Sequence, residues 1–151
     1  MSTHSYNKVW LHLIWGTKGH QKTISTAART KVSRKLFEIA QDKNIFLKSC
    51  HVHSNHVHTL IDLPTNYTIE QAAKYFKGIS SNYLKKEGLL NSSFSWCKGY
   101  GVFSVSESVV EKVVKYIKNQ DKHHRTKTFR EEVQDFLVAY NLEYTEGWFL
   151  E

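Results

Sequence analysis

The apolar residues of the chain recur with two different periods along its length. Alternation of apolar and polar positions is typical of strands and predicts strands over residues 6–17, 45–52, 56–63 and 100–105, with a further short β segment at 94–96. Spacings of three and four residues are typical of helices and predict helices over 26–43, 68–86, 106–120 and 128–140. The predicted order is therefore strand, helix, strand, strand, helix, strand and then two further helices.

Three of these helices begin with residues whose side chains commonly cap a helix. Thr68 with Gln71, and Thr128 with Glu131, have the spacing of a capping box, in which each side chain accepts a hydrogen bond from the other residue's backbone N–H. Ser106 is the predicted N-cap of the third helix. These signals locate the helix starts independently of the apolar spacing.

The order of elements predicts an α+β fold. Strand, helix, strand, strand, helix, strand is the split βαβ arrangement of ferredoxin-like folds, in which an antiparallel sheet carries helices on one face. The two additional helices would follow this core. At 151 residues the chain is expected to be one domain, 1–151, with its core at about 5–130 and a C-terminal helical extension at about 128–151.

The composition indicates the kind of binding partner and the cellular compartment of the protein. A formal net charge of +7 and a pI near 9.4 favour an anionic partner, most commonly nucleic acid, without identifying one. The two cysteines, Cys50 and Cys97, are too few for a disulfide framework and have no CxxC spacing. No apolar run approaches the roughly 18 residues of a membrane span. We therefore expect a cytoplasmic protein without a membrane partner.

Two short patterns carry candidate chemistry. His56 and His58 are two positions apart on a predicted strand, so their imidazoles project from one face about 6.5 Å apart and could reach one metal ion. Tyr116 and Gln120 are four positions apart on a predicted helix, so a phenol and a carboxamide share a face. Taken singly, each pattern is more often structural, as a pair of hydrogen-bonded histidines or a core aromatic side chain.

Together with their surroundings, these patterns resemble the single-tyrosine HUH transposases of bacterial insertion sequences and their REP-associated relatives. HUH stands for His, bulky hydrophobic, His. The resemblance covers about residues 5–130 and rests on five segments: Leu11-His12-Leu13-Ile14-Trp15-Gly16-Thr17-Lys18, Asn55-His56-Val57-His58-Thr59-Leu60-Ile61, Phe76-Lys77-Gly78-Ile79-Ser80-Ser81, Tyr116-Ile117-Lys118-Asn119-Gln120, and His123-His124.

The resemblance implies a DNA transposase that acts as a metal-dependent endonuclease and strand transferase on single-stranded DNA. Tyr116 would be the nucleophile and would form a 5′-phosphotyrosine intermediate, while His56, His58 and Gln120 would bind the metal. Two imidazoles and one amide oxygen leave coordination positions open, which suits Mg²⁺ or Mn²⁺, and the imidazoles favour Mn²⁺. The implied ligand is single-stranded DNA at hairpin-forming ends of the element.

The resemblance also implies a homodimer whose active sites are shared, with the histidine pair of one subunit facing the tyrosine helix of the other. A monomer with that helix on its own histidines is the alternative. Basic residues concentrate around the candidate nucleophile and are expected to contact DNA phosphates, although a charged helix exterior would look the same: Lys112, Lys115, Lys118, Lys122 and Arg125.

Several alternatives remain open at this stage. His51-Val52-His53 repeats the His-x-His tripeptide one strand earlier, so this copy could bind the metal in place of His56 and His58. Cys50 beside it could instead contribute, with Cys97, to a structural zinc site. A non-enzymatic module could instead stack single-stranded nucleic acid on exposed aromatic side chains such as Trp10, Trp15 and Tyr100. A domesticated REP-type nickase that no longer moves its own element would use the same active site.

Overall fold

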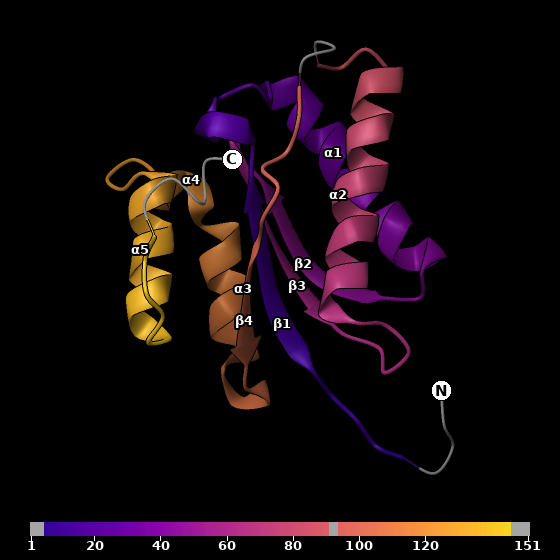
Figure 1. Ribbon diagram of the computed structural model, residues 1–151, viewed down its shortest axis with the longest axis vertical. Coiled ribbons are helices and arrows are strands. Elements are labelled where there is room, and N and C mark those ends of the chain that lie inside the picture. The colour runs from indigo at the N-terminus through magenta and orange to yellow at the C-terminus, as the bar shows by residue number, and fades with distance from the viewer. Residues whose placement is uncertain (1–4, 91–93, 146–151) are drawn as a thin grey trace.

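The computed structural model describes residues 5–90 and 94–145, and its centre is a four-stranded antiparallel sheet (Figure 1). The sheet has the order β2-β3-β1-β4, which is the order expected of a ferredoxin-like split βαβ core. The α+β fold class is thereby confirmed. The strands are β1 (Trp10–Gly16), β2 (Phe46–Val52), β3 (His56–Asp62) and β4 (Gly101–Val105).

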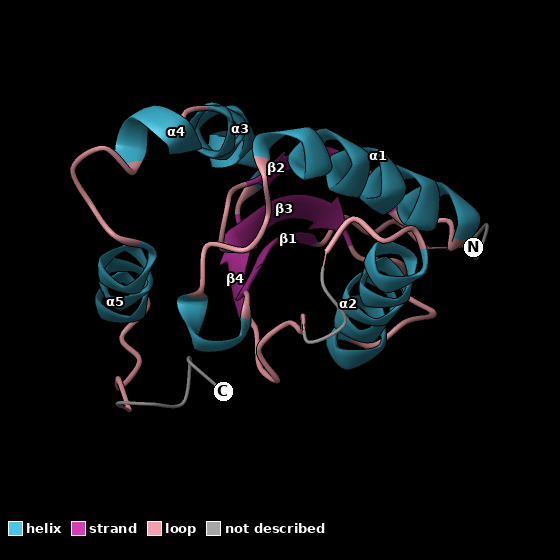
Figure 2. Ribbon diagram, turned by 90° about the horizontal axis from the view of Figure 1, so that it is seen from above, coloured by secondary structure: helices cyan, strands magenta, loops and turns pink. Residues whose placement is uncertain are grey.

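Helices α1 (Thr26–Asp42) and α2 (Ile69–Lys86) cover one face of the sheet (Figure 2). The buried side of α1 packs with that of α2 against Leu13, Trp15 and Val57 in the largest hydrophobic cluster. Thr68 and Gln71 form the predicted capping box at the start of α2. This layer is the helical face that the sequence predicts for the ferredoxin-like core.

The C-terminal helices lie against the opposite face, as both ribbon views show (Figures 1 and 2). They are α3 (Val110–Lys118), the short α4 (Gln120–His123) and α5 (Phe129–Ala139). Helix α3 packs on Trp10 and Leu60, whereas α5 packs on Ile14 and Phe103. Strand β1 is therefore buried on both faces. The polar side chains of β1 and β3 that point toward this second helical layer, His12, His56 and His58, are buried beneath α3 and α5.

Several element boundaries differ from the prediction. Strand β1 begins at Trp10 instead of residue 6, and residues 94–96 form only a single bridge between Trp96 and Thr17. The helix expected from Ser106 starts as a 3₁₀ turn, η2 (Glu107–Val109), and the Ser106 side chain makes no capping hydrogen bond. The helix then breaks at Asn119, where φ is −94° and ψ is 19°, so Tyr116 and Gln120 lie on separate helices.

The C-terminal extension is described only in part. Thr128 and Glu131 form the predicted capping box of α5, and the chain can be followed to residue 145. Residues 146–151, most of the tail beyond the predicted last helix, lie outside the described residues, as do residues 1–4. Within the described ranges, no helix has both the length and the apolar character needed to cross a membrane.

Candidate metal and nucleophile site

His56 and His58 lie on β3 and project into the space between the sheet and helices α3 and α5. Both side chains are fully buried, and their ring centroids are 5.2 Å apart. The alternation of the strand places both imidazoles on the face opposite Val57, which belongs to the α1 and α2 core. The structure therefore brings the two predicted metal ligands together in an enclosed position.

Each of these imidazoles is held by a second side chain. The Nδ1 atom of His56 is 2.7 Å from the Oδ1 atom of Asn55, to which its N–H donates, and Nδ1 of His58 is 2.7 Å from Nε2 of His12. A partner at Nδ1 leaves Nε2 of each ring facing the centre of the site. This is the usual way in which proteins orient metal-binding histidines.

Asn55→Ala is therefore expected to weaken Mn²⁺ binding about 10–100-fold, because His56 would lose the acceptor that fixes its tautomer and ring orientation. Calorimetric titration of the DNA-free protein with MnCl₂ measures this. Asn55→Asp keeps an acceptor oxygen and should restore most of the affinity. Unchanged Mn²⁺ affinity in Asn55→Ala would show that the hydrogen bond does not orient the ring.

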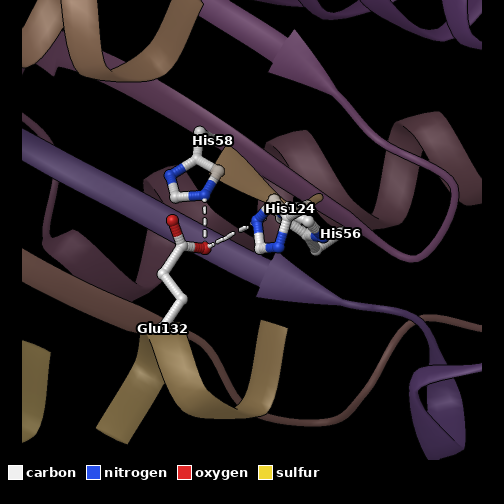
Figure 3. Close-up of side chains that lie close together, drawn as sticks. All are labelled: His56, His58, His124 and Glu132. Atoms are coloured by element: carbon white, nitrogen blue, oxygen red, sulfur yellow. Dashed lines mark hydrogen bonds and ion pairs between the residues drawn. The ribbon is translucent and has the colours of Figure 1, made fainter. Parts of the chain in front are cut away.

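Two residues without an assigned role in the sequence analysis complete the cluster (Figure 3). His124 follows α4, and Glu132 lies on α5; together with His56 and His58 they offer ligand atoms that all lie within 4.8 Å of one another. One oxygen of Glu132, Oε1, is 3.0 Å from Nε2 of His58 and 3.3 Å from Nε2 of His124.

A signal for Glu132 was present in the sequence. It is three residues after Phe129 and four before Phe136, which places a carboxylate on the apolar side of a predicted helix. In the structure its side chain is 1% exposed. A carboxylate at such a position is costly unless it is paired, and therefore indicates a polar site under the helix.

Gln120 is also fully buried and points into the cluster. Its Oε1 atom is 3.4 Å from Nε2 of His56 and 2.8 Å from Nε2 of His124. The break at Asn119 has not removed Gln120 from the site, because its carboxamide still faces the same histidines. Of the three predicted metal ligands, His56 thus lies near both of the others, His58 and Gln120.

Tyr116, the predicted nucleophile, reaches the same cluster from α3. Its ring centroid is 5.9 Å from that of His58, and its hydroxyl donates a hydrogen bond to the second carboxylate oxygen of Glu132, Oε2. Partial burial and this bond to a carboxylate raise the pKa of the Tyr116 phenol above its usual range. In the metal-free protein the phenol is therefore protonated.

The cluster combines one carboxylate with three imidazoles. Burial, reinforced by the neighbouring His58, lowers the pKa of His56 well below its usual value, so its imidazole is in the neutral, metal-binding form at pH 7. Burial opposes the charge of Glu132, but hydrogen bonds from His124 and His58 outweigh it and hold the Glu132 pKa well below its normal range. The site therefore contains the donor types that a divalent cation requires.

The other His-x-His tripeptide lies beside this cluster and has a different partner. His51 and His53 both point Nε2 toward Oδ1 of Asp121, at 3.5 and 3.6 Å. Both rings are partly exposed. The His53 ring also stacks on that of His56, with centroids 4.9 Å apart, so this tripeptide borders the cluster without being buried as His56 and His58 are.

The cysteines are also separate from the cluster. Cys50 packs against the α1 and α2 core, and the Cys97 thiol donates to the carbonyl of Thr17. Neither belongs to the group of ligand atoms around Glu132. The arrangement therefore gives no support to a zinc site built from these thiols.

A basic cleft of about 570 Å³ opens beside His124. It runs along the start of α5, and its cationic lining residues are Lys22, Arg125, Lys127 and Arg130. Of the residues predicted to bind DNA, Arg125 lines this cleft, and the others are exposed on α3 and α4: Lys112, Lys115, Lys118 and Lys122.

Comparison with known proteins finds similar sequences over most of the chain. The family model described as "Transposase IS200 like" matches residues 5–120. The transposases for insertion sequence element IS200 of Salmonella typhimurium strain LT2 and of Salmonella typhi are each 26% identical over 114 residues, which cover 72% of this chain and 74% of each relative.

Solved structures agree with the fold. A crystal structure from Deinococcus radiodurans R1, of a protein assigned as a transposase, superimposes with a TM-score of 0.61 at 25% identity, covering 80% of this chain and 96% of the other. A REP-associated tyrosine transposase bound to a REP hairpin gives a TM-score of 0.61 at 12% identity, over 82% of this chain and 74% of the other. At that identity the second likeness shows the shared fold alone.

Proposed function

Because this chain belongs to the IS200-like transposase family, we propose that it is a transposase that cuts and rejoins single-stranded DNA through Tyr116. The observation that carries the proposal is the position of the Tyr116 hydroxyl at the edge of the buried histidine cluster. A phenol from α3 and the proposed metal ligands from β3 and α4 lie close together there, as a metal-assisted tyrosine nucleophile requires.

The donor set fits a divalent cation. His56 and His58 would hold it through Nε2, with Gln120 contributing its amide oxygen, and we propose Mg²⁺ or Mn²⁺. When bound, such an ion acts as a Lewis acid on a phosphate and orients it for in-line displacement. The buried imidazoles face one another with their Nδ1 atoms already occupied, so little rearrangement is needed to bind it.

In the proposed reaction, Oη of Tyr116 attacks the phosphorus of a DNA backbone phosphate. A bond forms between Oη and phosphorus as the bond from phosphorus to the 3′ oxygen breaks, which leaves a 5′-phosphotyrosine and a free 3′-OH. A second 3′-OH can later displace the tyrosine. The covalent link retains the energy of the broken phosphodiester, so rejoining needs no ATP.

The basic surface gives the DNA a path to the site. The cleft beside His124 carries four cationic side chains, which would neutralise backbone phosphates. We propose that the exposed lysines of α3 and α4 extend this track: Lys112, Lys115, Lys118 and Lys122. Hairpin-forming single strands are the proposed substrates, and the REP-associated neighbour is itself bound to a hairpin.

The proposal is tested with single-stranded oligonucleotides from the DNA that flanks this reading frame. With Mn²⁺ or Mg²⁺ present, a fraction of the protein should migrate as a covalent DNA adduct on a denaturing gel, with a free 3′-OH on the released fragment. Duplex DNA of the same sequence should react poorly. Absence of cleavage with every flanking single strand, in protein that binds the metal, would contradict the proposal.

Shared active sites in a homodimer are a separate proposal, because one chain places its own Tyr116 beside its own His58, which is the arrangement of the monomer alternative. Protein with His56→Ala and protein with Tyr116→Phe, each inactive alone, would be mixed and allowed to exchange subunits. Shared sites give heterodimers one intact site, and cleavage should return to a fraction of wild type. No recovery despite demonstrated exchange would show that each chain supplies a complete site.

The non-enzymatic alternative is not favoured. Base stacking would require exposed aromatic side chains on the sheet, but Trp10 is 7% exposed and Trp15 is fully buried, with helices over both faces. A nicking enzyme that no longer mobilises its own element would retain all the chemistry described above. Hairpin-forming repeats beside the reading frame would distinguish that case from an active mobile element.

A further inference from the structure

The family model ends at residue 120, yet the cluster draws two of its members from beyond that point. His124 and Glu132 lie in the segment that follows Gln120, and Glu132 comes from α5. The carboxylate is the only anionic member of the group formed with His56, His58 and His124. Because Glu132 lies on α5, the position of this helix determines whether a carboxylate faces the histidines.

Helix α5 is held in this position by specific packing. The ring of Phe129 stacks on the imidazole of His56 with centroids 4.1 Å apart and an interplanar angle of 7°. Gly16 makes room for it, because a Cβ atom there would lie 2.8 Å from Cε2 of Phe129. One turn further along α5, Val133 packs on Ile14 and Phe103. These contacts direct the intervening Glu132 into the cluster.

The distances around Oε1 of Glu132, which are hydrogen-bond and ion-pair distances, also match those of ligands sharing one ion. At a metal–ligand bond length of about 2.1 Å, octahedral ligands lie about 3.0 Å apart when adjacent and about 4.2 Å apart when opposite. Oε1 is 3.0 Å from Nε2 of His58, 3.3 Å from Nε2 of His124 and 3.9 Å from Nε2 of His56. All three separations fall in that range.

The two oxygens of Glu132 face different partners. Oε1 faces the histidines, whereas Oε2 accepts the hydrogen bond of the Tyr116 hydroxyl. Burying a carboxylate among imidazoles contributes little to stability compared with an apolar side chain of similar size, so a stabilising role does not account for this arrangement. A ligand that also orients the nucleophile does account for it.

We propose that Glu132 is a metal ligand through Oε1 and at the same time positions the nucleophile through the hydrogen bond between Oε2 and Tyr116. This inference rests on the proposed metal site at His56 and His58. It makes α5 an integral part of the active site and links metal binding directly to the orientation of the tyrosine.

The test is calorimetric titration of the DNA-free, full-length protein with MnCl₂. Glu132→Gln is nearly isosteric and removes the charge, so Mn²⁺ affinity should fall about tenfold or more. Asp135→Asn makes the same chemical change on the same helix, at a side chain that is 60% exposed and paired with Lys127, and should bind Mn²⁺ like wild type. Wild-type affinity in Glu132→Gln would overturn the proposal.

Two further measurements separate this inference from other failures. If circular dichroism shows that metal-free Glu132→Gln is not folded, Glu132→Asp takes its place. This variant keeps the charge but has a side chain shorter by one methylene, so Mn²⁺ binding should again be weaker. Undiminished Mn²⁺ binding by Glu132→Asp would contradict the proposal. If wild type binds Mn²⁺ through Glu132 but cuts no single strand, the proposed transposase chemistry fails while the ligand assignment stands.

Discussion

Replacing Tyr116 with phenylalanine is expected to abolish the covalent DNA adduct, with a loss of about a thousandfold or more, because no oxygen remains to attack the phosphate. The ring should stay in place, since its contacts with His12 and Phe136 involve the aromatic face and edge. Binding of single-stranded DNA should therefore change little. Adduct yield on a denaturing gel and DNA affinity by fluorescence anisotropy measure the two effects separately.

Tyr140→Phe is the matched control for this change. The Tyr140 hydroxyl donates to the carbonyl of Ser104, away from the histidine cluster, so its removal tests the loss of a structural phenol hydroxyl. Adduct formation by Tyr140→Phe should equal that of wild type. An adduct of undiminished yield in Tyr116→Phe, mapped to another residue, would remove Tyr116 from the mechanism.

Replacing His58 with alanine is expected to lower the rate of DNA cleavage about a hundredfold or more. The ion would lose a buried ligand, and the scissile phosphate would no longer be aligned for attack. His56→Ala and Gln120→Ala should act in the same direction. His51→Ala and His53→Ala should have mild effects, since these rings face Asp121. Single-turnover cleavage at fixed Mn²⁺ measures all five variants.

The histidine series also tests the metal itself. Thermal unfolding of each metal-free variant shows whether a loss of cleavage follows from a loss of fold, which matters most for the fully buried His56 and His58. A defect in His51→Ala as large as that in His58→Ala would move the site to the other tripeptide. Complete cleavage in EDTA would favour a metal-free mechanism, and tightly bound zinc in the purified protein would favour a structural site.

Local interactions made much of the fold predictable from sequence. The capping boxes of Thr68 with Gln71 and of Thr128 with Glu131 form as their spacing predicts, because each involves residues only three positions apart. Alternation along residues 56–61 placed His56 and His58 on one face for the same reason. The order of elements then restricted the sheet to few topologies.

Tertiary packing decided what local patterns could not. A continuous helix through Tyr116 and Gln120 was expected, yet the chain breaks at Asn119 and still delivers both side chains to the site. Trp10 was expected at the surface of the alternative module, but a second helical layer buries it. The delivery of these side chains to the site and the burial of Trp10 both require α3 to dock on the sheet.

The sequence by itself determined the ferredoxin-like core, the paired histidines of one strand and, through a resemblance, the candidate nucleophile. Only the tertiary structure brought Glu132 to His58, a contact between residues 74 positions apart. That contact depends on Phe129 stacking on His56 beside Gly16, where any side chain larger than hydrogen would collide. No helical or strand period records such an approach, because it arises from the shapes of two surfaces that meet only after the chain has folded.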